Sequence, residues 1–520
     1  MVLVSPTAVV APAEPSLAFY SSTPLLALNS RAVVDRLPHP RTPFESPCRA
    51  LLRALANRDL ISEPIKYIEA SRNAPIEVSG RRPMRGRVRP AMLGGNRYIL
   101  HASIIGLSKT PVFFIGLLSA IDLLIIPVFW QRGLNGDLEH YVIPWYNFLL
   151  EHGAFSALAA DFSDYTPSYL YLLSIGTLAH GILDPATVIR AISVSFNAIA
   201  VVLVYAFAVA KGWSRSKAIQ IASIFFALPE MILNSLVWGQ TDIIYTLFLM
   251  AFIYFLLKER CWLATMMLGI AFAFKLQTVF IGPFVLYLLL VRLLLWRQLV
   301  LAPLMYLLFM APSALAGRSW RDLLTIYLNQ AKWDESMSIN APNPYFVFDR
   351  LFPDSHRFGI YIGLVITVIV SLVLVTSFVR RGRDRSPHGL LLMATLTLTI
   401  TPYVLPKMHE RYFFPAGAMA FLLAVVRPSS WPIVVLIQAA NLCAYTRFSQ
   451  GFSLLWFRWG AIFMTCALGM LICLFLQRPA VGASWSPGGQ KCNSSHPPRC
   501  VPRRPMPSTI FALFCRRHDD

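Results

Sequence analysis

The sequence predicts an all-α polytopic membrane protein with about twelve transmembrane helices. Of its 520 residues, 56% are hydrophobic and only 14% are charged, whereas a soluble domain carries about 25% charged residues. The mean hydropathy is +0.56, and over so long a chain the apolar residues cannot all be buried in a water-soluble core. Long apolar runs with short polar breaks begin near Pro111.

The charge divides the chain into three regions. Residues 1–110 carry 15 Lys and Arg against 7 Asp and Glu, and residues 478–520 carry 7 against 2. Both ends are rich in Pro and lack hydrophobic periodicity, so we expect basic, largely disordered cytoplasmic segments there. Residues 111–477 form the predicted membrane domain. Most of the net charge of +20 belongs to the two ends, so it does not indicate nucleic-acid binding.

Twelve apolar runs are candidate spans, because a spanning helix needs about 20 mostly apolar residues. They are 111–130, 188–210, 217–236, 240–257, 262–275, 278–292, 298–316, 357–379, 387–404, 411–427, 430–446 and 452–477. The basic loops should all face the cytoplasm. This requires that 262–292 crosses twice, turning at Lys275-Leu276-Gln277, and that 167–183 does not cross. Two long outer loops then remain, 131–187 and 317–356.

This topology places four polar clusters on the outer face. They are Gly136-Asp137-Leu138-Glu139, Trp238-Gly239-Gln240-Thr241-Asp242, Lys275 with Gln277, and Lys407-Met408-His409-Glu410-Arg411. Four clusters that converge on one face indicate a functional site.

The last of these clusters suggests a binding site for an anionic phosphate. Lys407, His409 and Arg411 lie at the end of an apolar span, where Lys and Arg often only extend to lipid headgroups. However, cations on the outer side run against the orientation rule and need their own explanation. Arginine offers paired donors to a phosphate, and lysine offers a point charge. Lys275 lies within an apolar run, where a charge indicates function by default and a structural turn is the alternative.

Asp137 is the candidate general base. It follows a glycine, as turn residues often do, but a carboxylate beside a phosphate site can also take the proton of a hydroxyl nucleophile. Glu139, Asp164 and Tyr165 lie in the same outer loop, where aromatic rings suit a sugar face. The polar break at 238–242 is either part of this site or a capped helix start.

Other polar residues are expected to be structural. Asp122 and Glu230 lie within predicted spans, and we expect both to be paired inside the helix bundle. The eight cysteines show no disulfide framework. Cys492, His496 and Cys500 have a loose metal-like spacing that is too weak to predict a metal site.

Taken in order, the motifs resemble the GT-C superfamily of polytopic glycosyltransferases, which take sugars from polyprenyl-phosphate carriers. They are Gly-Asp-x-Glu at 136–139, Asp-Tyr-Thr-Pro-Ser-Tyr at 164–169, Trp-Gly-Gln-Thr-Asp at 238–242, Lys-Leu-Gln at 275–277, Asn-Ala-Pro-Asn-Pro-Tyr at 340–345 and Met-His-Glu-Arg-Tyr at 408–412. The set is most similar to bacterial membrane mannosyltransferase-like proteins and to glucosyltransferases that use dolichyl-phosphate glucose. It covers about 137–415, and neither terminus shares it.

The resemblance implies a GT-C module and a role for each motif residue. Asp137 matches the catalytic base, His409 and Arg411 match donor-phosphate contacts, and Lys407 and Lys275 would assist them. The other motif residues would bind substrate: Glu139, Asp164, Tyr165, Trp238, Gln240, Asp242, Gln277 and Glu410. We expect no metal and no other cofactor, because the nearest relatives of this pattern need none.

The implied reaction transfers a hexose, mannose before glucose, from a polyprenyl-phosphate sugar to a hydroxyl of a glycan, lipid or protein, with inversion. The sequence has no Gly-rich nucleotide loop. We expect a multi-pass protein of the plasma (inner) membrane, surrounded by lipids, with its active site on the extracytoplasmic face. A polytopic transporter or lipid-linked-sugar flippase is the alternative, since polar breaks within spans also mark transporter sites.

Overall fold

The computed structural model describes residues 118–127, 136–330, 336–351, 356–382, 384–448 and 454–477. The chain divides into two units, Met1–Leu93 and Gly94–Asp520, and every described residue lies in the second. The predictions for the two terminal segments, including the Cys492, His496 and Cys500 spacing, therefore fall outside the described residues. Within them the fold is helical apart from one pair of two-residue strands, which confirms the all-α class.

Helices coincide with all the predicted spans. They are a helix over Leu118–Pro127, α7 (Pro185–Ala210), α8 (Arg215–Phe226) with α9 (Pro229–Ile232) and η4 (Leu233–Val237), α10 (Asp242–Leu257), α11 (Cys261–Phe274), η5 (Leu276–Ile281) with α12 (Gly282–Leu290), α13 (Trp296–Leu299) with α14 (Leu301–Ala316), α17 (His356–Arg381), α18 (Pro387–Val404), α19 (Phe414–Val426), η7 (Pro428–Ser430) with α20 (Trp431–Phe448), and α21 (Leu454–Leu476). Short elements fill the predicted outer loops and the turn before α19: η1 (Leu138–Val142), α5 (Ile143–His152), η2 (Ser156–Ala159), α6 (Pro167–Gly176), η3 (Thr177–Ala179), α15 (Trp320–Gln330), β1 (Ser338–Ile339), α16 (Tyr345–Leu351) and β2 (Met408–His409).

Four of the described helices are long and apolar enough to cross a membrane, over Pro185–Ala210, Trp296–Ala316, Arg357–Arg381 and Arg458–Leu476. The bent pair Arg215–Phe226 and Pro229–Val237 makes a fifth when it is taken as one span. These helices mark the chain as a membrane protein. The other predicted spans coincide with shorter or less apolar helices, so the number twelve stays a prediction.

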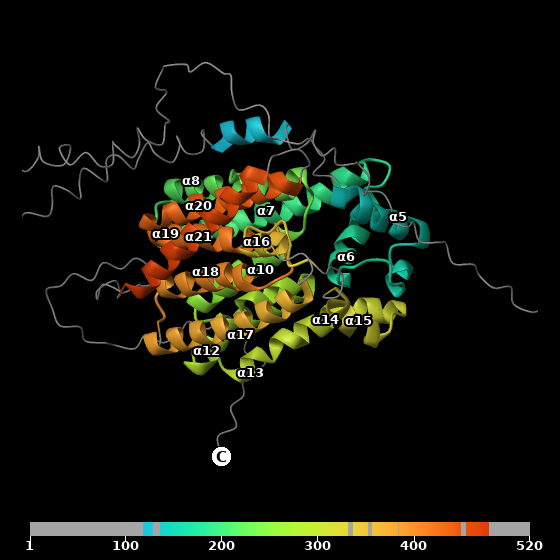
Figure 1. The fold of residues 1–520 in the computed structure, drawn as a ribbon. Coiled ribbons are helices and arrows are strands. Elements are labelled where there is room, and N and C mark those ends of the chain that lie inside the picture. The colour runs from blue at the N-terminus through green and yellow to red at the C-terminus, as the bar shows by residue number, and fades with distance from the viewer. Residues whose placement is uncertain are drawn as a thin grey trace, which may run out of the picture. The chain divides into compact units, whose positions relative to one another are not determined.

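The shorter helices α10, α18 and α19 form the centre of the bundle. Nearly every residue of α19 from Phe414 to Val425 is buried, and α10 and α18 are buried on most of their faces. Helices that are apolar on all sides belong inside a bundle, where neighbours cover them. Figure 1 shows α10 and α18 among the longer helices, with α5, α6 and α15 gathered at one end.

The chain reverses at the predicted turn between α11 and α12. Lys275 has an extended backbone, with φ −154° and ψ 135°, which ends α11. At the far end of the pair, the Cys261 Sγ donates a hydrogen bond to the Leu293 carbonyl over 3.6 Å. The start of α11 therefore lies beside the segment that follows α12, so the two helices run in opposite directions.

Basic side chains of two connections lie at the other end of the bundle: Arg381 and Arg385 at the connection between α17 and α18, and Lys258 directly after α10. Arg385, before α18, pairs with Glu259, after α10, at 2.9 Å. Arg381, at the end of α17, donates to the carbonyl of Phe475 near the end of α21. These contacts bring the connections after α10 and α17 and the end of α21 together at one end of the bundle; the direction in which that end faces stays a prediction.

Candidate active site

Asp137 contacts residues from two distant segments at the end of the bundle opposite these basic loops. Its Oδ2 accepts hydrogen bonds from the Gln240 Nε2 and the Arg411 Nη1, each at 2.9 Å. Gln240 lies just before α10 and Arg411 just before α19, and both helices belong to the centre of the bundle. About 20% of the Asp137 side chain remains exposed, so a hydroxyl group can approach a carboxylate that is held in place.

Lys275 forms a buried ion pair with Asp242. The Lys275 Nζ lies 2.5 Å from the Asp242 Oδ1, and the two side chains are 9% and 0% exposed. The Asn234 Nδ2 donates to the other carboxylate oxygen over 3.0 Å. The rings of Tyr165 and Tyr245 have their centres 5.7 and 5.6 Å from the ammonium, a distance at which aromatic faces attract cations. Lys275 is therefore already neutralised, and a phosphate has to compete with Asp242 for it.

Arg411 joins these two groups. Besides Asp137, its Nη1 donates to the Glu410 Oε1 over 3.1 Å, and its Nε lies 4.0 Å from the Asp242 Oδ2. Its guanidinium lies over the ring of Trp238, 5.3 Å from the ring centre. All four predicted polar clusters thus meet in one connected network around Arg411.

The charge of this network differs from the expected surplus of cations. Two cations, Lys275 and Arg411, face three carboxyl groups, Asp137, Asp242 and Glu410. The His409 side chain is about 30% exposed; burial of the rest, together with the charges of Arg411 and Lys275, lowers its pKa to about 3. His409 is therefore neutral near pH 7 and can offer a phosphate only a neutral hydrogen bond.

Glu410 is the group in this network that titrates near neutral pH. Its side chain is fully buried, and this burial raises its pKa to about 7 against the opposing influence of Arg411, with smaller contributions from Asp137 and Asp242. A carboxyl group with a raised pKa is neutral below that pKa and charged above it. The site therefore carries one negative charge fewer below pH 7 than above it.

This titration predicts a pH dependence for binding of an anionic substrate. The apparent affinity is expected to fall by about tenfold as the pH rises from 6 to 8, because ionised Glu410 repels a phosphate. The measurement is KM for a phosphate-bearing sugar donor across this range. In Glu410→Gln the affinity should stay at its low-pH value over the whole range. If KM of this variant still rises between pH 6 and 8 as it does in the wild type, the assignment to Glu410 is contradicted.

The first predicted outer loop is anchored to the Lys275 turn. The hydroxyl groups of Thr166 and Ser168 both donate to the carbonyl of Ala273, over 2.6 and 2.8 Å. This anchoring places Tyr165 between Lys275 and Trp145, whose ring centre lies 5.1 Å from that of Tyr165. Tyr165 thus forms part of the wall beside the network, where the sequence predicts a substrate contact.

The second predicted outer loop reaches the same site through its strand. β1 pairs in parallel with β2, with Ser338 opposite Met408 and Ile339 opposite His409. Lys407, just before β2, has a backbone φ of +64°, a conformation that costs a non-glycine residue about 1 kcal/mol or more. Its amide donates to the Met337 carbonyl over 2.8 Å. The loop therefore covers the segment that carries His409 and Arg411.

Three predicted substrate contacts form no described hydrogen bond or ion pair to the network. Glu139 is exposed, and Gln277 is buried with an Oε1 that has no hydrogen-bond partner among the described residues. The carbonyl of Asp164 accepts a bond from the Gln330 side chain, while burial and the nearby Asp161 raise the pKa of its carboxyl group. None of the three forms a described bond to Asp137, Asp242 or Arg411.

Two further residues, Asn234 and Tyr245, contact the pair of Lys275 and Asp242, and neither was identified from the sequence as a site residue. Asn234 donates to Asp242, and Tyr245 lies beside Lys275. The available signal for Asn234 was a polar amide inside an apolar span, eight residues before Asp242. Tyr245 had no such signal, because an aromatic residue on an apolar helix is common.

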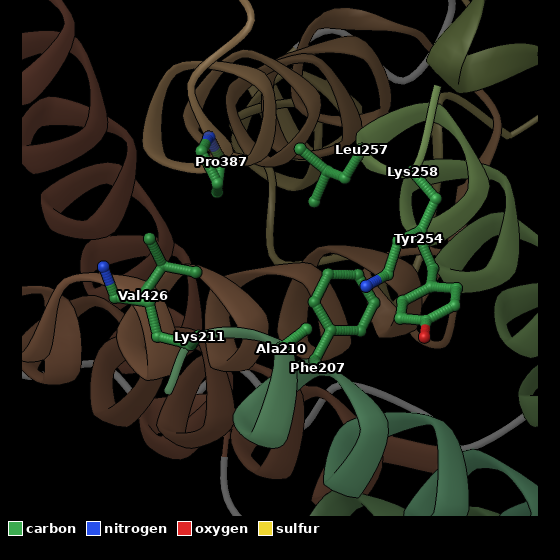
Figure 2. A pocket seen from close by; sticks show the side chains of 8 residues that line it. All are labelled: Phe207, Ala210, Lys211, Tyr254, Leu257, Lys258, Pro387 and Val426. Atoms are coloured by element: carbon green, nitrogen blue, oxygen red, sulfur yellow. The ribbon is translucent and has the colours of Figure 1, made fainter. Parts of the chain in front are cut away.

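Neither of the two cavities found among the described residues is lined by a residue of the network. A small hollow lined by Phe207, Ala210, Lys211, Tyr254, Leu257, Lys258, Pro387 and Val426 is formed by the opposite ends of α7, α10, α18 and α19 (Figure 2). It is distant from Asp137 because α10 begins at Asp242 and ends at Leu257. A groove of about 600 Å³ lies between α16, α18 and α21, lined by Pro344, Phe346, Val347, Tyr403, Arg458, Ala461, Ile462 and Thr465.

Among the described residues, no group of three or more His, Cys, Asp or Glu side chains is placed to hold a metal ion. The carboxylates of Asp137 and Asp242 are instead bound to cations and amides of the chain.

The fold and the network together define a helical membrane protein with an acidic and basic site at one end of its helices. Comparison with known proteins identifies its activity: residues 162–406 match the family model described as Glycosyltransferase family 87. The protein is an enzyme, a glycosyltransferase, and its helical membrane body is consistent with the GT-C kind. No curated protein and no solved structure gives a significant match. Asp137 and Arg411 lie outside the matched residues, and their assignment depends on the contacts described above.

Proposed function

We propose that the enzyme transfers a hexose from a polyprenyl-phosphate carrier to an acceptor hydroxyl on the extracytoplasmic face, with inversion at the anomeric carbon. The observation that carries this proposal is the contact between Asp137 and Arg411, a candidate base and a candidate phosphate ligand 2.9 Å apart. Mannose is the favoured hexose and glucose the second. The acceptor is a glycan, lipid or protein hydroxyl, and the host membrane is the plasma (inner) membrane.

The chemistry is a single displacement. The acceptor oxygen forms a bond to C1 of the sugar while its proton passes to Asp137. The bond between C1 and the phosphate oxygen breaks, and its electron pair stays on the phosphate. That leaving group needs stabilisation of charge rather than a proton, which Arg411, Lys275 and Lys407 would supply, with a hydrogen bond from His409. The mechanism uses no metal ion.

The groove between α16, α18 and α21 is a second observation in favour of a lipid-linked donor. Its volume of about 600 Å³ is typical of a ligand site, and its lining is mainly apolar. Tyr403 lies at the end of α18, shortly before Lys407, so an apolar chain in this groove would lead toward the proposed phosphate contacts.

Filling the groove is expected to weaken donor binding. Ile462→Trp should raise KM for a long-chain polyprenyl-phosphate sugar about tenfold and leave KM for a short, water-soluble analogue nearly unchanged. Leu476→Trp, at an exposed position near the far end of α21, is the matched control. Equal effects on the long and short donors would contradict this role for the groove.

The proposal as a whole is tested with membranes that contain the enzyme and synthetic donors. Sugar should be transferred from polyprenyl-phosphate mannose or glucose and not from nucleotide sugars, and transfer should persist in EDTA. If the enzyme takes sugar only from nucleotide sugars, the proposed polyprenyl-phosphate donor is wrong. Loss of activity in EDTA would contradict the metal-free mechanism. A transporter or flippase would move the donor across the membrane without forming a new glycosidic bond.

A further inference from the structure

A buried carboxylate that the proposed chemistry does not use lies at the break in the third predicted span. α8 ends at Phe226, and the next helical segment is bent from it by 56°. Pro229 accounts for the break, since the residue before a proline is driven out of the helical region, and Leu228 is extended with ψ 129°. Glu230 follows directly and is fully buried.

Glu230 is clamped by α20. Its carboxylate accepts bonds from the Gln438 Nε2 over 2.6 Å and from the Asn441 Nδ2 over 2.5 Å. Its backbone amide, which has no intrahelical partner at a helix start, donates to the Gln438 Oε1 over 3.3 Å. A Cβ on Gly417 of α19 would lie 2.5 Å from the carboxylate, so a glycine there leaves room for the clamp.

The segment held in this way carries three groups that contact the site. Asn234 donates to Asp242, the ring of Trp238 lies under Arg411, and Gln240 donates to Asp137. Between them the chain forms a π-helical turn, η4, and the amide of Gln240 donates to the carbonyl of Asn234 over 2.9 Å. Within about ten residues the segment therefore connects Glu230 to Asp137.

α20 touches this segment a second time. Tyr445, one turn beyond Asn441, packs edge-on against Trp238 with ring centres 5.4 Å apart. α20 lies wholly beyond residue 406, where the match to the glycosyltransferase family ends. A helix outside the matched region thus holds the segment that orients Asp137 and Arg411.

We propose that Glu230 is a positioning residue: clamped by Gln438 and Asn441, it fixes the segment through which Gln240 and Trp238 orient Asp137 and Arg411. This inference rests on the proposed function of Asp137 as base. A displacement of about 1 Å at reacting groups can cost about 100-fold in rate, so the clamp is expected to act on kcat more than on KM.

The test compares Glu230→Ala with the isosteric Glu230→Gln and with Tyr287→Phe. The last removes a hydroxyl that donates to the Gly382 carbonyl and accepts from the Asp384 amide, at the other end of the bundle. Per folded enzyme, Glu230→Ala should lower kcat about 10- to 100-fold, Glu230→Gln should restore it to within about threefold, and Tyr287→Phe should leave it unchanged. If Glu230→Ala does not fold, Asn441→Ala and Gln438→Ala each remove one bond to the carboxylate.

Coupling to the site is measured in a double-mutant cycle with Gln240→Ala. If Glu230 acts through Gln240, its replacement should lower kcat less than about threefold in the Gln240→Ala background. An undiminished effect in that background, or an unchanged kcat in Glu230→Ala, would overturn the inference.

Hydrogen exchange separates this inference from the proposed function. In Glu230→Ala, peptides covering residues 229–242 should exchange faster, while peptides from α14 and α17 should not. Faster exchange in an enzyme that takes no sugar from any polyprenyl-phosphate donor would reject the proposed function and retain the clamp. Unchanged exchange over 229–242 would reject the clamp.

Discussion

Replacing Asp137 with asparagine is expected to lower kcat by about 100- to 10,000-fold while the protein still folds. General bases contribute rate factors of this size, and an amide of the same shape cannot accept the acceptor's proton. The amide oxygen introduced at this position can still accept bonds from Gln240 and Arg411, so the local contacts should survive. The measurement is the initial rate of sugar transfer per folded enzyme.

Glu151→Gln provides the matched control for Asp137→Asn. It removes an exposed acid of the same predicted outer loop that forms no described bond to the network, so kcat should change less than about threefold. Equal losses in the two variants would assign the effect to the charge of the loop. Normal transfer by Asp137→Asn would remove Asp137 from the mechanism.

Breaking the ion pair between Lys275 and Asp242 should have the largest effect on stability. Lys275→Met leaves a fully buried carboxylate without its nearest cation, and breaking a buried ion pair in this way typically costs about 3–5 kcal/mol. The apparent unfolding temperature in detergent should fall by about 5 °C or more. The pair Lys275→Met with Asp242→Asn should recover much of this loss, because the neutral amide oxygen that replaces the carboxylate can still accept the bond from Asn234.

The double variant also separates structure from catalysis. If Lys275 contributes to phosphate binding, the stabilised double variant should still have a raised KM for the donor. A double variant no more stable than Lys275→Met would show that the buried charge is not the source of the loss.

The helical fold was predictable because each helix carries its own apolar signal. Hydropathy placed α7, α14, α17 and α21, and the charge of the connecting loops predicted the reversal at Lys275. Which helices are long enough to cross the membrane was less predictable. The helices α10 and α19 are short, and they are apolar because they are buried within the bundle. Apolarity from burial in protein and apolarity from contact with lipid have the same composition.

Which residues meet in the candidate site was predictable in part, and how their charges pair was less predictable. The motifs identified Asp137, Gln240, Asp242 and Arg411, which the fold brings together. Which acid pairs with which base was not predictable, because such contacts depend on distances between segments far apart in the sequence. The pair of Lys275 with Asp242 is the example. In place of the surplus of cations inferred around residue 408, the structure has a network of two cations and three carboxyl groups.

Glu230 illustrates the same limit in a different way. Its sequence context indicated a structural acid paired within the bundle, and the structure confirms that pairing with Gln438 and Asn441. Its link to Asp137 depends on the path of the segment from Pro229 to Gln240, which includes a break and a π-helical turn. Neither of these features has a residue pattern that predicts how the segment is oriented.

The most direct test of the central claim is the anomeric configuration of the product, determined by NMR after transfer by the purified enzyme from a polyprenyl-phosphate hexose of known configuration. A direct displacement with Asp137 as base predicts a new glycosidic bond of inverted configuration. A retained configuration would contradict the single displacement. Failure to transfer from either mannosyl or glucosyl carriers would contradict the proposed donor class.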